Sequence, residues 1–524
     1  MKNKPWLIVG IIITLALAIR LINFASNPPS LYWDEVAIGL DARSLIATGK
    51  DLSGQSWLQP LFYSYGDYKA PIYIGLVALL GQLFPINELT IRLPSLLAFI
   101  GLCLSFYLLL KEISPKKSLL PFFGLASLAI MPWSYHFSRI GMESHLSLLW
   151  LTLSLYLLIS GIKRSKPLNI VLAGLSLSLG IYSYIALRII GPVLFTLAFL
   201  IYRFPRYSAS LKSFLLSLTI ILTSIYFLTT SPSYQPSQQY RLSNDNLVRS
   251  TKHVLQSAVS LNAYPQNSLL PRLVHHRYIY KLKNYFTNYL TYFSPDFLFF
   301  SGDPNLRHHS GYGGMLLLSQ SVFLLFGLFS FSKLGVRNSL FIFAWILLSP
   351  SIAALVNETP HASRSIYLMA PLATLTGLGW EQIKSQSKNK LVISFITLAI
   401  IFNLSLYLYD YHRYYPQRSH LAWITPYKKT FEYFKNNPPD RPVYIHPGLY
   451  QPGLYAAFYL DINPAELQSS KGEYLKNLNN FSFNLPATCP QESLCVTSPD
   501  WQNDSTQIVN QIPGTNILVI KQAK

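Results

Sequence analysis

Long apolar segments run through this chain of 524 residues, and they constrain its fold more than any other feature. A helix needs roughly 17–25 mostly apolar residues to cross the hydrocarbon core of a bilayer. Charged residues make up 12% of the chain, well below the roughly 25% of a soluble protein. We therefore predict an α-helical polytopic membrane protein. The eleven expected spans lie at about 6–25, 91–110, 119–137, 145–161, 168–185, 187–202, 211–230, 314–331, 339–356, 365–382 and 391–409.

The shorter apolar segment 70–84 decides the topology. If it does not cross, the short basic loops all fall on one side, which the positive-inside rule makes cytoplasmic. These loops carry the Lys and Arg residues near 2–4, 111–117, 163–166, 203–212, 333–337 and 384–390. We therefore expect 70–84 to be a juxtamembrane or re-entrant helix on the outer face of the cell membrane. The N-terminus is then cytoplasmic, and segment 6–25 is a retained helix because no small-residue cleavage site follows it.

The same threading divides the chain into two expected domains. Residues 1–409 form a transmembrane domain with outer loops 26–90 and 231–313, and residues 410–524 form a small extracytoplasmic domain. Short β-type runs at 442–445 and 516–520 predict an α/β or α+β unit there. Cys489 and Cys495 lie close together in this domain, and an oxidising compartment would allow a disulfide between them.

The formal net charge of +20 is typical of nucleic-acid-binding proteins as well as of membrane proteins. In this chain the basic residues occur in small groups between apolar segments. That distribution is a signature of membrane topology, and it excludes a continuous basic face for nucleic acid. The expected partner is the lipid bilayer.

Asp34 and Glu35 stand just after the first apolar segment. Adjacent carboxylates at the mouth of a membrane helix are costly to desolvate, so their presence needs a reason. One reason is catalysis at the bilayer surface, where Asp34 would act as a general base on an acceptor hydroxyl or amine. The other is structural, since either acid is able to cap the helix that follows.

Further polar residues gather on the predicted outer face. Cations there suit the phosphate of an anionic lipid-linked donor. The histidines are typical interfacial hydrogen-bonding groups and also metal ligands, while lone cations near helix ends often contact lipid headgroups. The candidate residues are Lys69, Arg139, Glu143, His145, Tyr182, Tyr184, Arg188, His308, His309, His361 and Arg364.

Five segments of the chain resemble the protein O-mannosyltransferase and aminoarabinose transferase superfamily, which has the GT-C fold. The most specific are the acidic pair in 29–35 and the Lys-x-Pro start of 68–73. The other segments are 91–95, Ser138-Arg139 with Glu143, and 297–305. Lys69-Ala70-Pro71 departs mildly from the Lys-Pro-Pro that is common in relatives.

The resemblance implies a polyprenyl-phosphate sugar donor, an inverting single displacement and an extracytoplasmic active site. By that analogy Asp34 is the catalytic base, and Glu35 beside it binds the acceptor or supports the base. The donor phosphate would be held by Lys69, Arg139, His361 and Arg364, and Glu143 would support the site. Their place on the predicted outer face makes Arg188 a further candidate for donor phosphate, and His145, Tyr182 and Tyr184 candidates for binding acceptor or supporting the site.

The acceptor, protein or glycolipid, is left open by the sequence, and so is the need for a divalent metal, because no compact ligand spacing fixes a site. A different class of protein, a transporter or flippase of lipid-linked sugars, would use the same cations without chemistry. Transporters tend to show repeated halves with broken helices at the bilayer midplane. This chain shows no repeat, and its polar residues lie at one surface, which favours the enzyme.

Overall fold

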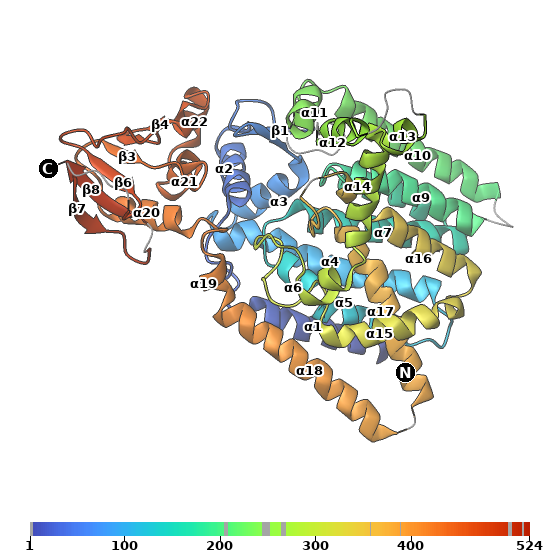
Figure 1. Cartoon of the computed structure of the whole chain (residues 1–524). Coiled ribbons are helices and arrows are strands. Elements are labelled where there is room, and N and C mark those ends of the chain that lie inside the picture. Colours follow the sequence, from blue (N-terminus) through green and yellow to red (C-terminus); the bar gives the residue numbers. More distant parts are fainter. Residues whose placement is uncertain are drawn as a thin grey trace. The chain divides into compact units, whose positions relative to one another are not determined.

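The computed structural model describes residues 4–203, 208–243, 252–263, 269–356, 358–387, 389–500, 506–515 and 518–523 (Figure 1). The chain forms two compact units. The helical unit contains Met1–Leu21, Leu97–Ser138 and Glu143–Asp410, and the mixed unit contains Ile22–Leu96, Arg139–Met142 and Tyr411–Lys524. The first outer loop therefore folds with the C-terminal residues.

Five helices of the described residues are long and apolar enough to cross a membrane. They are Glu88–Ile113 (α4), Glu143–Lys163 (α7), Leu211–Thr229 within α10 (Ser208–Thr229), Val336–Leu355, which includes α16 (Val336–Leu348), and Lys390–Arg413 (α18). Other apolar helices are shorter, so the expected number of eleven spans stays a prediction. The remaining helices of the helical unit are α1 (Lys4–Leu21), α5 (Leu120–Ile130), α6 (Pro132–Phe137), α8 (Pro167–Ile181), α9 (Leu187–Arg203), α11 (Tyr234–Ser243), α12 (Lys252–Leu261), α13 (Leu269–Val274), α14 (Arg277–Thr291), α15 (Leu318–Phe329) and α17 (Met369–Gln386).

The expected span 119–137 is not one helix, because it divides into α5 and α6. Met131 between them is extended, with ψ 128°, and Pro132 opens the second helix. A residue before proline is disfavoured in the helical conformation, and proline lacks the amide that would continue the hydrogen-bond ladder. The proline therefore accounts for the break.

Glycines let α15 and α17 approach closely. A Cβ atom on Gly327 would lie 1.9 Å from the carbonyl oxygen of Leu375, and one on Gly379 would lie 1.8 Å from that of Phe323. Small residues at helix contacts are typical of proteins that pack helices within a bilayer. This packing forms part of the core of the helical unit.

The N-terminal part of the mixed unit is a helix, a hairpin and a short helix. They are α2 (Trp33–Thr48), β1 (Phe62–Ser64), β2 (Asp67–Lys69) and α3 (Pro71–Gly81). The 11 residues of α3 are too few to cross a bilayer, which needs about 20. Its length agrees with the expected juxtamembrane position of 70–84.

The C-terminal part of the mixed unit carries a six-stranded sheet in the order β4-β5-β3-β6-β8-β7 (Figure 1). The strand β3 is parallel to both of its neighbours, and the other pairs are antiparallel. The elements are α19 (Tyr415–Ser419), α20 (Thr425–Asn436), β3 (Val443–Ile445), α21 (Pro452–Tyr459), α22 (Pro464–Ser469), β4 (Asn477–Leu478), β5 (Phe481–Ser482), β6 (Leu494–Thr497), β7 (Thr506–Gln511) and β8 (Val519–Ala523).

Two expectations fall on this sheet. The run 442–445 contains β3, and the run 516–520 overlaps the start of β8, although 516–517 lie outside the described residues. Cys489 and Cys495 are joined by a disulfide bond that ends within β6. The C-terminal residues are thus a mixed α/β layer tied by a short covalent loop.

Candidate active site

Asp34 lies in the first turn of α2 and is the most accessible carboxylate of the acidic pair. Its side chain is 29% exposed, whereas that of Glu35 is fully buried. The Lys69 ammonium group and the Tyr65 hydroxyl both donate hydrogen bonds to Oδ1 of Asp34. Because the Lys69 side chain is only 4% exposed, the ion pair is held in one geometry while the carboxylate still reaches solvent.

The β1–β2 hairpin places both of these donors. Its two-residue turn is Tyr65-Gly66, and both residues have positive φ, at 39° and 95°. Such turns match the twist of a hairpin, but a bulky residue is costly in the left-handed region. The Lys69 ammonium group also lies 5.0 Å from the Tyr65 ring centroid, a cation–π contact. The hairpin therefore holds Tyr65 and Lys69 together against Asp34.

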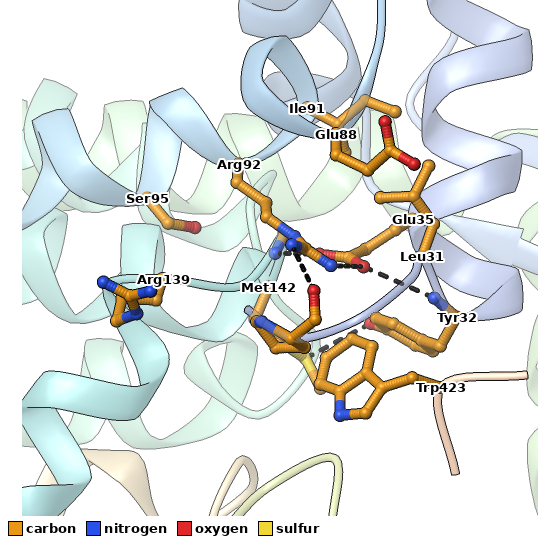
Figure 2. Close-up of polar contacts among 12 residues, drawn as sticks. Leu31, Tyr32, Glu35, Glu88, Ile91, Arg92, Ser95, Arg139, Met142 and Trp423 are labelled. Carbon is orange, nitrogen blue, oxygen red and sulfur yellow. Dashed lines mark hydrogen bonds and ion pairs between the residues drawn. The ribbon is translucent and has the colours of Figure 1, made fainter. Parts of the chain in front are cut away.

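The Glu35 side chain points into the protein, whereas that of Asp34 is partly exposed. It forms an ion pair with Arg92 at 3.2 Å, and it accepts hydrogen bonds from the amides of Gly141 at 2.6 Å and Tyr32 at 3.4 Å (Figure 2). Burial raises the pKa of Glu35, and the Arg92 charge and the amide donors oppose that rise. The Tyr32 contact caps the start of α2, which is the structural role considered for one of the two acids.

Arg92 ties this buried carboxylate to the loop before α2. Its guanidinium donates to the carbonyls of Ala25, Pro28 and Ser30 at 3.0, 3.0 and 2.5 Å. It also lies 5.6 Å from the Trp423 ring (Figure 2). Removing one member of a buried ion pair leaves an uncompensated charge. Arg92 and Glu35 thus position the segment that carries Asp34.

Arg139 is fully buried and donates to three backbone carbonyls, those of Ile22, Asn23 and Asn27, at 2.8, 3.1 and 2.9 Å. Its guanidinium also lies 5.5 Å from the Tyr411 ring. These contacts hold the turn at the start of the mixed unit. They favour a structural role for Arg139 over the expected contact with donor phosphate.

A second polar cluster lies in the helical unit. Asp303, His308 and His361 are buried, and one ligand atom from each lies within 4.8 Å of the others. His308 Nδ1 is 3.1 Å from Asp303 Oδ2, and the Ala362 amide donates to the same oxygen at 2.7 Å. Burial alone would raise the pKa of Asp303, but the His308 charge and these hydrogen bonds hold it below its ordinary value.

His361 in this cluster is held neutral. Burial, followed by the charges of His308, Arg364 and Arg307, lowers its pKa well below the ordinary value. Among the described residues, the buried Nδ1 atom of His361 has no hydrogen-bond partner. One carboxylate and two imidazoles, one of them neutral with an uncommitted nitrogen, fit the ligand preferences of a divalent transition metal.

The other expected site residues also lie in the helical unit. Tyr184 shares a hydrogen bond of 3.2 Å with Ser363, and the Tyr182 hydroxyl donates to the carbonyl of Ser224 at 2.9 Å. Half-buried Arg188 donates to the carbonyl of Ile181 at 3.4 Å. His145 is buried on α7, which begins at Glu143, and His309 is buried beside Gly302. Asp34, Glu35, Lys69 and Arg139 belong to the mixed unit instead.

Sequence reasoning gave no role to Tyr65, Arg92 or Asp303. Tyr65 is followed by a glycine, and the two residues lie between two short β-type segments. This pattern is a hairpin signal that would have placed Tyr65 beside Lys69. Arg92 is a charge near the start of an expected span, and such a residue needs a buried partner. Asp303 and His308 lie five residues apart in one loop, but His361 comes from a separate loop, so the sequence alone does not bring the three residues together.

No known family model matches this sequence, and no curated protein matches it either. Solved structures do. An aminoarabinose transferase, ArnT from Cupriavidus metallidurans bound to undecaprenyl phosphate, matches with a TM-score of 0.54 and 11% identity over 98% of this chain and 97% of that one. The chain has the GT-C fold.

The archaeal oligosaccharyltransferase AglB from Archaeoglobus fulgidus is a second GT-C neighbour. Its complex with an inhibitory peptide and dolichol-phosphate matches with a TM-score of 0.50 and 14% identity over 93% of this chain and 69% of that one. A form of the enzyme tethered to an acceptor peptide also gives 0.50, at 13% identity. In that match this chain covers 63% of the archaeal protein's length. At such identities the GT-C likeness concerns the fold.

Proposed function

We propose that this protein is an integral-membrane glycosyltransferase that moves one sugar from a polyprenyl-phosphate donor to an extracytoplasmic acceptor. The observation that carries the proposal is the partly exposed Asp34 carboxylate, fixed by Lys69 and Tyr65 within a GT-C fold. The neighbours of the same fold are ArnT, with undecaprenyl phosphate, and AglB, with dolichol-phosphate and peptide.

Asp34 is the general base of the proposed reaction. An acceptor hydroxyl loses its proton to this carboxylate as its oxygen attacks the anomeric carbon. The bond from that carbon to the phosphate oxygen breaks, and the polyprenyl phosphate leaves with its electron pair. One displacement without a covalent intermediate inverts the anomeric configuration.

Lys69 connects the base with the donor. Its ammonium group is paired with Asp34, and it is the expected ligand of the donor phosphate. In this proposal the Lys69 ammonium group is paired with Asp34 alone before the donor binds, and it is shared between Asp34 and the phosphate afterwards. In this proposal donor binding draws Lys69 toward the phosphate, which relieves the ion pair on Asp34 and lets the carboxylate take a proton. Chemistry would then begin only after the donor is bound.

In this proposal Glu35 and Arg139 are positioning residues that do not contact the substrate. Glu35 is buried against Arg92, and Arg139 is buried against carbonyls, so neither meets the substrate. Both fix the segments on either side of the acidic pair. The exposed groups around Asp34 would bind the acceptor, whether it is a protein or a glycolipid.

Asp303, His308 and His361 would hold a divalent metal if one is used. A metal bound there would supply positive charge to an anionic group bound beside it. Even without a metal, Arg307 and Arg364 give this cluster a cationic environment. Burial is the main cause of the lowered pKa of His361, and the charges of His308, Arg364 and Arg307 lower it further.

The test is sugar transfer and slow donor hydrolysis by purified protein in nanodiscs, over a panel of polyprenyl-phosphate hexoses and pentoses. Wild type would be compared with Asp34→Asn, which keeps the shape and removes the charge, and with Asp500→Asn, an exposed acid as matched control. We expect turnover in wild type and the control, and a loss of more than a hundredfold in Asp34→Asn with donor still bound.

Equal turnover in Asp34→Asn and wild type would refute the role of the base. If wild type consumes no donor, and vesicles containing it move the lipid across the bilayer, the transporter hypothesis replaces that of the enzyme.

A further inference from the structure

Tyr450 is an exposed aromatic residue that the C-terminal part of the mixed unit brings to the acidic site. It lies in the loop between β3 and α21, and 43% of its surface is exposed. Its ring centroid is 5.0 Å from that of Trp33 and 6.5 Å from that of Tyr65, edge to face in both cases. Trp33 directly precedes Asp34, and Tyr65 donates a hydrogen bond to it.

The backbone that presents this ring is strained. Tyr450 has φ 77° and the next residue, Gln451, has φ 52°, so two successive non-glycine residues occupy the left-handed region. Bulky residues are disfavoured in this region, and such strain persists only where the surroundings impose it. Here the Tyr427 hydroxyl donates to the carbonyl of His446 at 2.7 Å and accepts from the amide of Leu449 at 3.2 Å.

Packing does not explain why the chain bears this strain. A ring that served only to fill a core would be buried, as Tyr427 and Tyr455 of the same unit are. Tyr450 instead contacts Trp33 and Tyr65, and a large part of its surface is exposed to solvent. A fixed, exposed ring next to a partly exposed carboxylate is typical of a binding surface.

We propose that Tyr450 binds the acceptor, and that the acceptor presents a saccharide ring to it. The inference rests on the proposed function and names the substrate class of the same site. The apolar C–H face of a sugar packs on an aromatic ring, while Asp34 accepts a hydrogen bond from the hydroxyl that attacks. A peptide acceptor would be recognised chiefly through backbone amides, whereas the groups gathered around Tyr450 are aromatic rings.

The experiment measures acceptor kinetics in nanodiscs free of glycoside detergent, with a fixed saturating donor. The acceptor probes are a panel of octyl hexosides below their micellar concentrations and, separately, a Ser/Thr-rich peptide. The variants are Tyr450→Ala, Tyr450→Asn and Tyr450→Phe. Asn tolerates the left-handed backbone, so Tyr450→Asn removes the ring without adding strain. Tyr414→Ala, which removes another exposed tyrosine of the same unit, is the matched control.

We expect the Ala and Asn variants to raise the KM for the octyl hexoside about 3- to 10-fold with kcat within about twofold, as the loss of one ring contact predicts. The Phe variant and the control should behave as wild type, because the contact uses the ring and not the hydroxyl.

An unchanged KM in both the Ala and Asn variants would overturn the proposal. So would a change confined to the peptide, or a wild type that hydrolyses donor but accepts no octyl hexoside. Failure of the proposed function has a different result, because wild type would then consume no donor at all.

Discussion

Lys69 donates a hydrogen bond to the carboxylate of Asp34 although 35 residues separate them. The hairpin of β1 and β2 makes this contact, because its strained turn returns the chain from Tyr65 to Lys69 on one side of Asp34. The carboxylate is therefore oriented before any substrate arrives.

The hydroxyl of Tyr65 is expected to matter for turnover more than for folding. Tyr65→Phe removes one hydrogen bond to the charged Asp34 and keeps the ring. This bond orients the carboxylate that takes the proton, and misorientation of a reacting group slows the reaction, so we expect kcat to fall about tenfold or more. Tyr63→Phe on the same hairpin is the control, because that side chain is exposed. Steady-state kinetics in which both variants equal wild type would contradict the role of Tyr65.

The buried pair of Glu35 and Arg92 is expected to stabilise the mixed unit. Glu35→Gln leaves the Arg92 guanidinium buried without its charge partner, and breaking such a pair typically costs about 3–5 kcal/mol. We expect a much lower unfolding temperature in detergent. Glu473→Gln is the matched control, because its pair with Lys476 has side chains that are 65% and 74% exposed. Equal melting temperatures for the two variants would show that the buried pair contributes little.

Asp41 predicts a pH dependence of stability. Burial, with a smaller contribution from Asp51, raises the pKa of this carboxyl from 3.8 to about 8. The native carboxyl holds a proton between these values and the unfolded one does not, so its stabilising contribution is greatest at low pH and is lost as pH rises toward 8. Asp41→Asn, which is neutral at every pH, should remove this part of the slope.

Melting temperatures of wild type and Asp41→Asn between pH 5 and pH 9 would test that expectation. We expect the variant to gain on wild type as pH rises. An exposed acid replaced in the same way, Asp500→Asn, should run parallel to wild type. Parallel curves for wild type and Asp41→Asn would mean that the buried carboxyl is already ionised in the native state.

The cluster of Asp303, His308 and His361 is expected to bind one divalent transition metal. Calorimetric titration of the chelator-treated protein with Zn²⁺ should show a single site, and saturating metal should raise the melting temperature by mass action. His361→Ala should abolish the site, whereas His420→Ala, which replaces a histidine outside the cluster, should leave it intact. Equal zinc binding by both variants would exclude this cluster as the metal site.

Much of the fold could be predicted from the sequence because its causes are local. Apolar segments become helices in a bilayer wherever they stand, and an 11-residue helix such as α3 is too short to cross. The strand β3 was expected from a run of β-type residues. Where prediction erred, at 119–137, the cause is also local, since Pro132 begins a second helix.

Local pattern by itself predicted a helical membrane protein with C-terminal strands and an acidic pair at the mouth of its first helix. Only the tertiary structure decided what each acid does. Glu35 turns inward to Arg92, 57 residues away, while Asp34 faces Lys69 and solvent. It also decided that Tyr450 joins this site. Hydropathy acts residue by residue, but the pairing of distant side chains depends on how loops close, and adjacent residues on a helix point in different directions.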